Sequence, residues 1–159
     1  MSQPVPEPEF DALYRELILD HYRNPRHHEP LAEPDVVAEG YNPLCGDEVE
    51  LRLRFDNGRV RDISFHGRGC SISQASGSML TDVVIGKPVD EAKHLIELVQ
   101  EMLTDAGKEP PEELGDLEAL QGVAKFPVRV KCATLAWHTL ADGLEQRAAG
   151  GGVAHHEEV

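Results

Sequence analysis

The sequence is poor in basic residues and has no long apolar run. It contains 15 Lys and Arg residues against 29 Asp and Glu residues, so its formal net charge is −14. So acidic a chain repels phosphate backbones, which argues against nucleic-acid binding. No apolar stretch approaches the roughly 20 residues that span a bilayer, and Met1–Glu9 lacks the character of a signal peptide. We therefore expect a cytoplasmic protein with no role at a membrane.

Cysteine is also scarce. There are three cysteines in 159 residues, and an odd number fits poorly with an internal disulfide framework. No CxxC pair is present, so the signatures of zinc fingers and of thioredoxin-type redox proteins are both missing. On their number alone, the three could simply be small buried apolar residues.

The length and composition predict one globular domain. A chain of 159 residues can form its own hydrophobic core, and 40% hydrophobic with 28% charged residues is typical of such domains. Residues 1–8 are rich in Pro and Glu, and we expect them to be disordered. We place the domain at residues 9–148 and interpret residues 149–159 as a flexible tail.

The hydrophobic pattern predicts an α+β fold. Apolar residues alternate with charged ones from Val49 to Phe55, and Asn57-Gly58 then signals a hairpin turn. We expect a small three-stranded antiparallel sheet packed against a set of helices. The expected strands are about 36–39, 49–55 and 60–66. The expected helices are about 10–24, 71–85, 90–105 and 112–121, with a last helix that begins at Cys132.

All three cysteines fall at expected element boundaries. Cys45 lies in a turn, Cys70 joins a strand to a helix, and Cys132 is expected to open the last helix. Loops and helix N-termini are common places for functional sites, and a helix N-terminus stabilises a thiolate. These positions favour a functional role over passive packing.

Cys45 and Asp47 form the tightest candidate pair. In an extended segment, residues two apart project to the same side, and Gly46 between them permits an unusual backbone angle. With Cys70 and Cys132 the set becomes three sulfurs and one oxygen, which suits tetrahedral zinc. Asp47 could instead be a plain turn former, and the spacing alone leaves both interpretations open.

Four stretches of the sequence resemble the SufU branch of the IscU/SufU family of iron–sulfur assembly proteins. They lie between residues 13 and 140, a range that is nearly the whole chain, and together form a specific pattern. The stretches are LYRELILDHYRNPR (13–26), NPLCGDEVEL (42–51), GRGCSISQASGSML (67–80) and FPVRVKCATLAWHTL (126–140).

The resemblance implies a function and a site. The functional positions of the family fall on Cys45, Asp47, Cys70 and Cys132, which would hold Zn²⁺. The implied role is that of a sulfurtransferase-like acceptor, rather than a stand-alone enzyme. It would take persulfide sulfur onto Cys45 from a SufS-like, pyridoxal-phosphate-dependent cysteine desulfurase and supply downstream cluster-assembly proteins.

Two features distinguish the SufU branch from the IscU branch. Scaffolds of the IscU type have a histidine before the last cysteine, where this chain has Lys131. Residues of about 107–125 look like the insertion that SufU-like proteins carry before the last helix. Arg129 matches the arginine that the SufU pattern has three residues before the last cysteine. The alternative function is a scaffold on which a [2Fe–2S] cluster is assembled, because thiolates bind iron as well as zinc.

Other polar residues are weaker candidates. Arg68, Arg129 and Lys131 flank ligands in sequence and could offset the negative charge of the metal centre, although the last two could equally be a solvated surface pair. The His155-His156 pair lies in the expected tail. His138 is six residues past Cys132, so on a helix it points to another side. The pattern therefore gives these histidines little weight as ligands.

Overall fold

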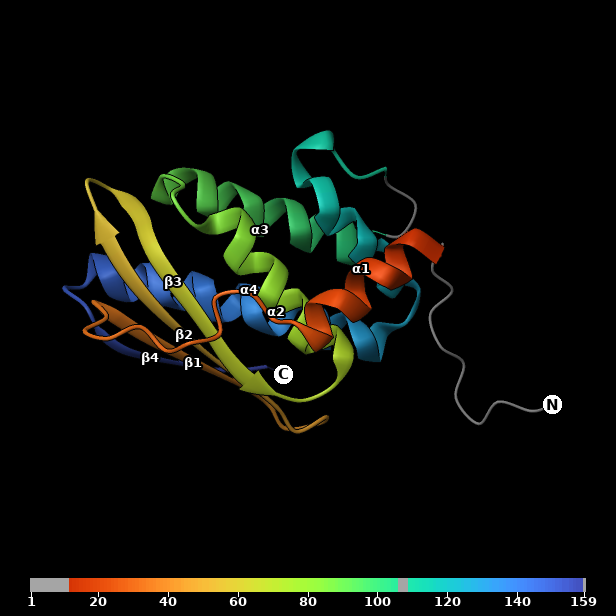
Figure 1. Ribbon diagram of the computed structural model, residues 1–159, viewed down its shortest axis with the longest axis horizontal. Coiled ribbons are helices and arrows are strands. Elements are labelled where there is room, and N and C mark those ends of the chain that lie inside the picture. Colours follow the sequence, from red (N-terminus) through yellow and green to blue (C-terminus); the bar gives the residue numbers. More distant parts are fainter. Residues whose placement is uncertain (1–11, 106–108, 159) are drawn as a thin grey trace.

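The computed structural model describes residues 12–105 and 109–158 (Figure 1). A mixed sheet lies beside a group of helices, and the elements follow in the order α1, β1, β2, β3, α2, α3, η1, α4, β4. Their bounds are α1 Ala12–Arg23, β1 Val36–Asn42, β2 Asp47–Asp56, β3 Arg59–Arg68, α2 Ser71–Val84, α3 Val89–Thr104, η1 Glu112–Lys125 (a 3₁₀ segment), α4 Pro127–Ala148 and β4 Gly152–Glu157.

The three predicted antiparallel strands are present. β2 pairs with β1 on one side and with β3 on the other, both antiparallel. The β2–β3 turn contains Asn57 with φ 51° and Gly58 with φ 72°. Two successive positive φ values are those of a type I′ hairpin, which Asn-Gly favours. The same period of two that predicted β2 buries Val49, Leu51 and Leu53 against the helices.

The predicted α+β class is confirmed, but the sheet formed by the described residues has four strands and is mixed, so the prediction of a three-stranded, purely antiparallel sheet is wrong. The strand order is β3-β2-β1-β4, and β4 runs parallel to β1. β4 comes from the segment expected to be a tail. Gly150, Gly151 and Gly152 all have positive φ values and turn the chain after α4. The Gly152 N–H donates to Asp35 O at 3.1 Å, which fixes the start of the strand.

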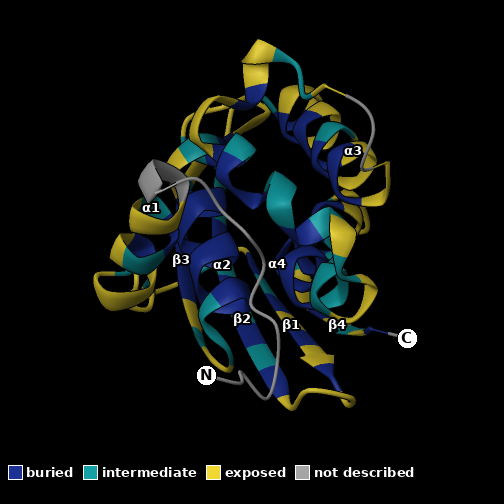
Figure 2. Cartoon of the chain, turned by 90° about the vertical axis from the view of Figure 1, so that its right-hand side faces the viewer, coloured by how far each residue is buried: buried dark blue, intermediate teal, exposed yellow. Residues whose placement is uncertain are grey.

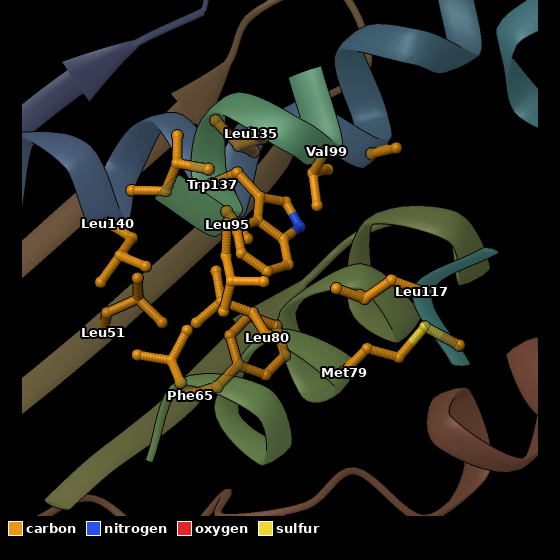
Figure 3. Packing of buried hydrophobic residues seen from close by; sticks show 14 of the residues in the cluster. Leu51, Phe65, Met79, Leu80, Leu95, Val99, Leu117, Leu135, Trp137 and Leu140 are labelled. Atoms are coloured by element: carbon orange, nitrogen blue, oxygen red, sulfur yellow. The ribbon is translucent and has the colours of Figure 1, made fainter. Parts of the chain in front are cut away.

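The hydrophobic core lies between one face of the sheet and the helices (Figures 2 and 3). α4 packs along β1, β2 and β4, and α2 packs on both α4 and β3. At Gly40 of β1 an added Cβ would meet Thr139 and Leu135 of α4, so this close approach depends on glycine. The labelled core residues are Leu51 and Phe65 from the sheet, Met79 and Leu80 from α2, Leu95 and Val99 from α3, Leu117 from η1, and Leu135, Trp137 and Leu140 from α4.

The last helix begins earlier than predicted. It starts at Pro127, and Cys132 lies in its second turn rather than at its first residue. Proline is favourable at the first helical position, where its missing N–H costs no hydrogen bond. The expected helix at 112–121 is a 3₁₀ segment that continues to Lys125 and is kinked at Gly115. Part of the expected 107–125 insertion, together with residues 1–8, lies outside the described residues.

Within the part of the chain that the structure describes, no helix combines the length and the apolar character needed to cross a membrane.

Candidate metal centre

Cys45 and Asp47 lie at the turn between β1 and β2. The Gly46 N–H donates to Asn42 O at 2.8 Å, and the Leu44 N–H donates to Asn42 Oδ1 at 3.1 Å. Gly46 has φ 72°, a value that favours glycine. The turn leaves Cys45 exposed, whereas Asp47 is the first residue of β2 and only 1% exposed. The two side chains therefore reach one region from an exposed and a buried position.

Cys70 is the N-cap residue of α2. Its extended backbone ends the connection from β3, and its Sγ accepts from the Ser73 N–H at 3.5 Å. An N-cap thiolate can take the place of the usual oxygen acceptor and also benefits from the helix dipole. The expected boundary position of this cysteine is therefore confirmed as a helix cap.

The residue before the cap is Gly69, with φ 150°. A Cβ at this position would meet the Asp47 carboxylate and lie 2.9 Å from Ser73 Oγ. The missing side chain lets the carboxylate approach the backbone, where Asp47 Oδ1 accepts from the Cys70 N–H at 3.0 Å. Gly69 is thus a part of the site that the sequence pattern did not single out, although it stands inside the GRGC motif.

Cys132 approaches the same region from α4. It is 1% exposed and its Sγ lies 3.8 Å from Val128 O. Buried hydrogen bonds tie this part of α4 to α2: Ser76 Oγ donates to Ala133 O at 2.7 Å and accepts from Trp137 Nε1 at 3.1 Å. These contacts fix Cys132 opposite the start of α2 and the β1–β2 turn.

The four predicted residues converge, although not equally. Candidate ligand atoms of Cys45, Asp47 and Cys132 all lie within 4.8 Å of one another. The Sγ atoms of Cys45 and Cys132 are 3.6 Å apart. Cys70 Sγ lies 3.8 Å from Asp47 Oδ2, which places the fourth residue at the side of the carboxylate. Three loops or helix ends that are distant in sequence therefore meet at one point.

The donor set fits zinc. Zn–S bonds of about 2.3 Å and tetrahedral angles imply sulfurs roughly 3.8 Å apart, close to the 3.6 Å between Cys45 and Cys132. With a Zn–O bond of about 2.0 Å, the expected S–O separation is roughly 3.5 Å, against 3.8 Å between Cys70 Sγ and Asp47 Oδ2. The three donors of Cys45, Asp47 and Cys132 are thus close enough to share one ion, and a fourth bond from Cys70 stays a prediction.

The partly buried thiol of Cys70 and the buried thiol of Cys132 perturb each other. A hydrogen bond from the Cys132 thiol, helped by the backbone N–H groups of α2, lowers the pKa of Cys70 to about 6. The same hydrogen bond, together with burial, raises the pKa of Cys132. Cys70 is therefore the more acidic of these two thiols.

The three predicted supporting cations are close in sequence to Cys70 and Cys132. Arg68 Nε donates to Glu48 Oε2 at 2.8 Å, and the Arg68 side chain is 80% exposed, so it pairs with a neighbouring strand residue rather than with a cysteine. Arg129 and Lys131 lie on α4 before Cys132 and are partly buried. A role for these cations in balancing the charge of a metal stays a prediction.

Comparison with known proteins identifies the family of the chain. The family model described as the NifU-like N terminal domain matches residues 13–133. The chain is 43% identical over 141 residues to the zinc-dependent sulfurtransferase SufU of Bacillus subtilis, covering 89% of this chain and 95% of that protein. It is 44% identical over 139 residues to the iron–sulfur cluster assembly scaffold protein IscU of Streptococcus pyogenes, covering 87% of each.

A solved structure is also similar. It is the crystal structure of a putative iron–sulfur cluster assembly scaffold protein for the SUF system from Fervidobacterium islandicum. The TM-score is 0.76 at 37% sequence identity, covering 81% of this chain and 94% of that chain.

Proposed function

The chain belongs to the IscU/SufU family of iron–sulfur cluster assembly proteins, with a NifU-like N terminal domain, and from this premise we propose that it is a zinc-dependent sulfur acceptor. The proposed ligands are Cys45, Asp47, Cys70 and Cys132, and the proposed acceptor is Cys45. The partner is a pyridoxal-phosphate-dependent cysteine desulfurase of the SufS type.

The contrast in exposure among the three cysteines carries the proposal. Cys45 is exposed on a turn, Cys70 is partly buried at a helix cap, and Cys132 is almost fully buried. An incoming persulfide must reach the sulfur that attacks it, and only the turn residue offers that access. A turn residue can also move more readily than one packed within a helix.

Sulfur transfer to Cys45 is an exchange between a thiolate and a persulfide, so it needs no external oxidant. The Cys45 thiolate attacks the outer sulfur of the desulfurase persulfide and forms a new S–S bond. The old S–S bond breaks, and the desulfurase cysteine leaves as a thiolate. Bound zinc would supply thiolates at neutral pH by displacing the protons of its sulfur ligands. Cys70, Asp47 and Cys132 would keep the site assembled while Cys45 reacts.

The test is cysteine turnover by the cognate desulfurase, with and without the zinc-loaded protein. We expect strong acceleration, together with a gain of one sulfur atom on the Cys45 peptide by mass spectrometry. Cys45→Ala should abolish both effects, while Asp47→Ala should chiefly reduce zinc retention. Arg61→Ala, an exposed change near the other end of β3, is the control. Undiminished sulfur transfer to Cys45→Ala would refute the assignment.

A second candidate function is supported by the similarity to a relative named as a scaffold. A [2Fe–2S] cluster could use the same three thiolates, because cysteine ligands serve both zinc and iron. Lys131, at the position before Cys132, offers no imidazole ligand in its place. Anaerobic reconstitution with iron and sulfide distinguishes the two: a stable chromophoric cluster on the Cys45, Cys70 and Cys132 thiolates favours the scaffold, and none favours the sulfur acceptor.

A further inference from the structure

A second group of metal-binding side chains lies between α4 and the C-terminal strand. It comprises His138 of α4, His156 of β4 and Glu158, which directly follows β4. Candidate ligand atoms of the three lie within 4.8 Å of one another. Glu158 Oε1 is 2.7 Å from His138 Nδ1 and 3.0 Å from His156 Nε2. None of these residues belongs to the cysteine centre.

The carboxylate at the middle of this cluster is buried and held in place. The Glu158 side chain is 6% exposed, and those of His138 and His156 are 27% and 21% exposed. Thr134 Oγ1 donates to Glu158 Oε2 at 2.8 Å. The backbone N–H of Glu158 donates to Tyr41 O at 2.8 Å. These contacts orient Oε1 toward the two imidazoles.

In each of the two histidines, one ring nitrogen (the inner one) faces Glu158, and the other (the outer one) faces a different side-chain oxygen. His156 Nδ1 lies 3.2 Å from Asp142 Oδ2, and His138 Nε2 lies 3.2 Å from Gln100 Oε1. Both oxygens are acceptors, so the outer nitrogens carry the N–H groups. In the neutral rings the inner nitrogens then present lone pairs, and they point at a carboxylate oxygen that also has only lone pairs. Three acceptors that face one another attract positive charge, which is a shared proton when no metal is bound and can be a metal cation instead.

We propose that His138 Nδ1, His156 Nε2 and the Glu158 carboxylate form a second metal site, for a divalent transition metal of the zinc class. Two imidazoles and one carboxylate are a common zinc donor set. A carboxylate or amide oxygen on the outer nitrogen of a ligating histidine is the usual support for such a ligand, and Asp142 and Gln100 occupy those positions.

The distances allow the metal with a small expansion of the cluster. Ligand bonds of about 2.0–2.1 Å imply roughly 3.3 Å between donor atoms, whereas the present separations are 2.7 and 3.0 Å. The three side chains would therefore move apart by about half an ångström. The partial exposure of both imidazoles leaves room for this movement and for entry of the ion.

The proposed metal would join α4 to β4 and so brace the strand that leads to Cys45. β4 pairs with β1 from Val36 to Tyr41, and the Glu158 N–H extends this pairing by one more hydrogen bond to Tyr41. β1 ends at Asn42, and the Cys45 turn follows it. The site is independent of the proposed sulfur chemistry, since none of its donors takes part in that reaction.

The test counts zinc on the full chain. Protein stripped by a strong chelator is dialysed against zinc in a slightly alkaline buffer with a weak competing chelator, and bound metal is measured by mass spectrometry. We expect one zinc at the cysteine centre and a second at the histidine cluster. Glu158→Gln and His156→Ala should each lose only the second. His155→Ala is the matched control, because its side chain is adjacent in sequence but 73% exposed and should retain both.

A second measurement does not depend on stoichiometry. Zinc should shift the ¹⁵N resonances of His156 Nε2 and His138 Nδ1 in long-range imidazole spectra. The same shifts should occur in a Cys45→Ser/Cys132→Ser double variant, which lacks two ligands of the cysteine centre. Glu158→Gln retains a hydrogen-bonding side chain, so it remains informative if His156→Ala disturbs β4. The proposal is overturned if the wild-type chain binds a single zinc, if His155→Ala loses as much zinc as His156→Ala, or if these resonances do not respond.

Discussion

Replacing Gly69 by alanine should weaken zinc binding at the cysteine centre. The new Cβ would meet the Asp47 carboxylate, which accepts from the Cys70 N–H at 3.0 Å. The carboxylate must move away, and it then loses a charge-assisted hydrogen bond of about 1.5–3 kcal/mol. Losing such a partner of a metal ligand typically lowers affinity by about 10–100-fold. The φ of 150° adds about 1–3 kcal/mol of backbone strain.

Gly86→Ala separates the two effects. Gly86 follows α2 and also has a positive φ, 80°, but an added Cβ there would meet nothing within 4 Å. Both variants should lose stability in urea unfolding of the metal-free protein, whereas only Gly69→Ala should lose zinc in competition with a chromophoric chelator. Equal zinc affinities for the two variants would refute the idea that the absent side chain at position 69 makes room for the Asp47 carboxylate.

Two further predictions concern the metal-free fold. The hydrogen bond to Glu158 raises the pKa of His138 above its ordinary value of 6.5, with Asp142 adding to the effect. His138 therefore stabilises the protein below about pH 6.5 and stops doing so as the pH rises through the higher folded value. Burial alone would raise the pKa of Glu158, but hydrogen bonds lower it from 4.5 to about 2, so its contribution is present above about pH 4.5 and is lost toward pH 2. Urea midpoints across pH should show a maximum near pH 4.5–6.5 that flattens in Glu158→Gln; an unchanged profile contradicts the pairing. Leu140→Ala, at a fully buried position of α4, should cost about 2–5 kcal/mol in urea unfolding, and a cost below about 1 kcal/mol would contradict the packing shown around it.

Local sequence signals accounted for much of the sheet. The alternation from Val49 to Phe55 and the Asn57-Gly58 pair define β2 and its turn through interactions between near neighbours, so they can be read without knowing the rest of the fold. The same holds for Cys70, whose place between a strand and a helix made it a cap. The spacing of Cys45 and Asp47 likewise indicated one shared region, and the structure brings them together with Cys132.

Long-range geometry accounts for what the sequence pattern missed. β4 begins at the third of three glycines, and its two apolar residues, Val153 and Ala154, are adjacent, so it has no alternating apolar face. It is a strand because β1 offers an edge beside it. The start of α4 was misplaced because Cys132 looked like a boundary while Pro127 supplies the real one. The Gly69 contact and the His138 cluster join segments far apart in sequence, and no local signal reports such a contact.

The parallel strand β4 also affects how this protein behaves toward other copies of itself. Without it, β1 would present a row of unpaired N–H and C=O groups, and such an edge is a template for strands from neighbouring molecules. β4 covers that edge and places exposed His155 and Glu157 on the outer strand. Charged and polar side chains on a short edge strand discourage further pairing. We therefore expect the C-terminal segment to protect the sheet against aggregation, so that a chain shortened before Gly152 self-associates more than the full chain.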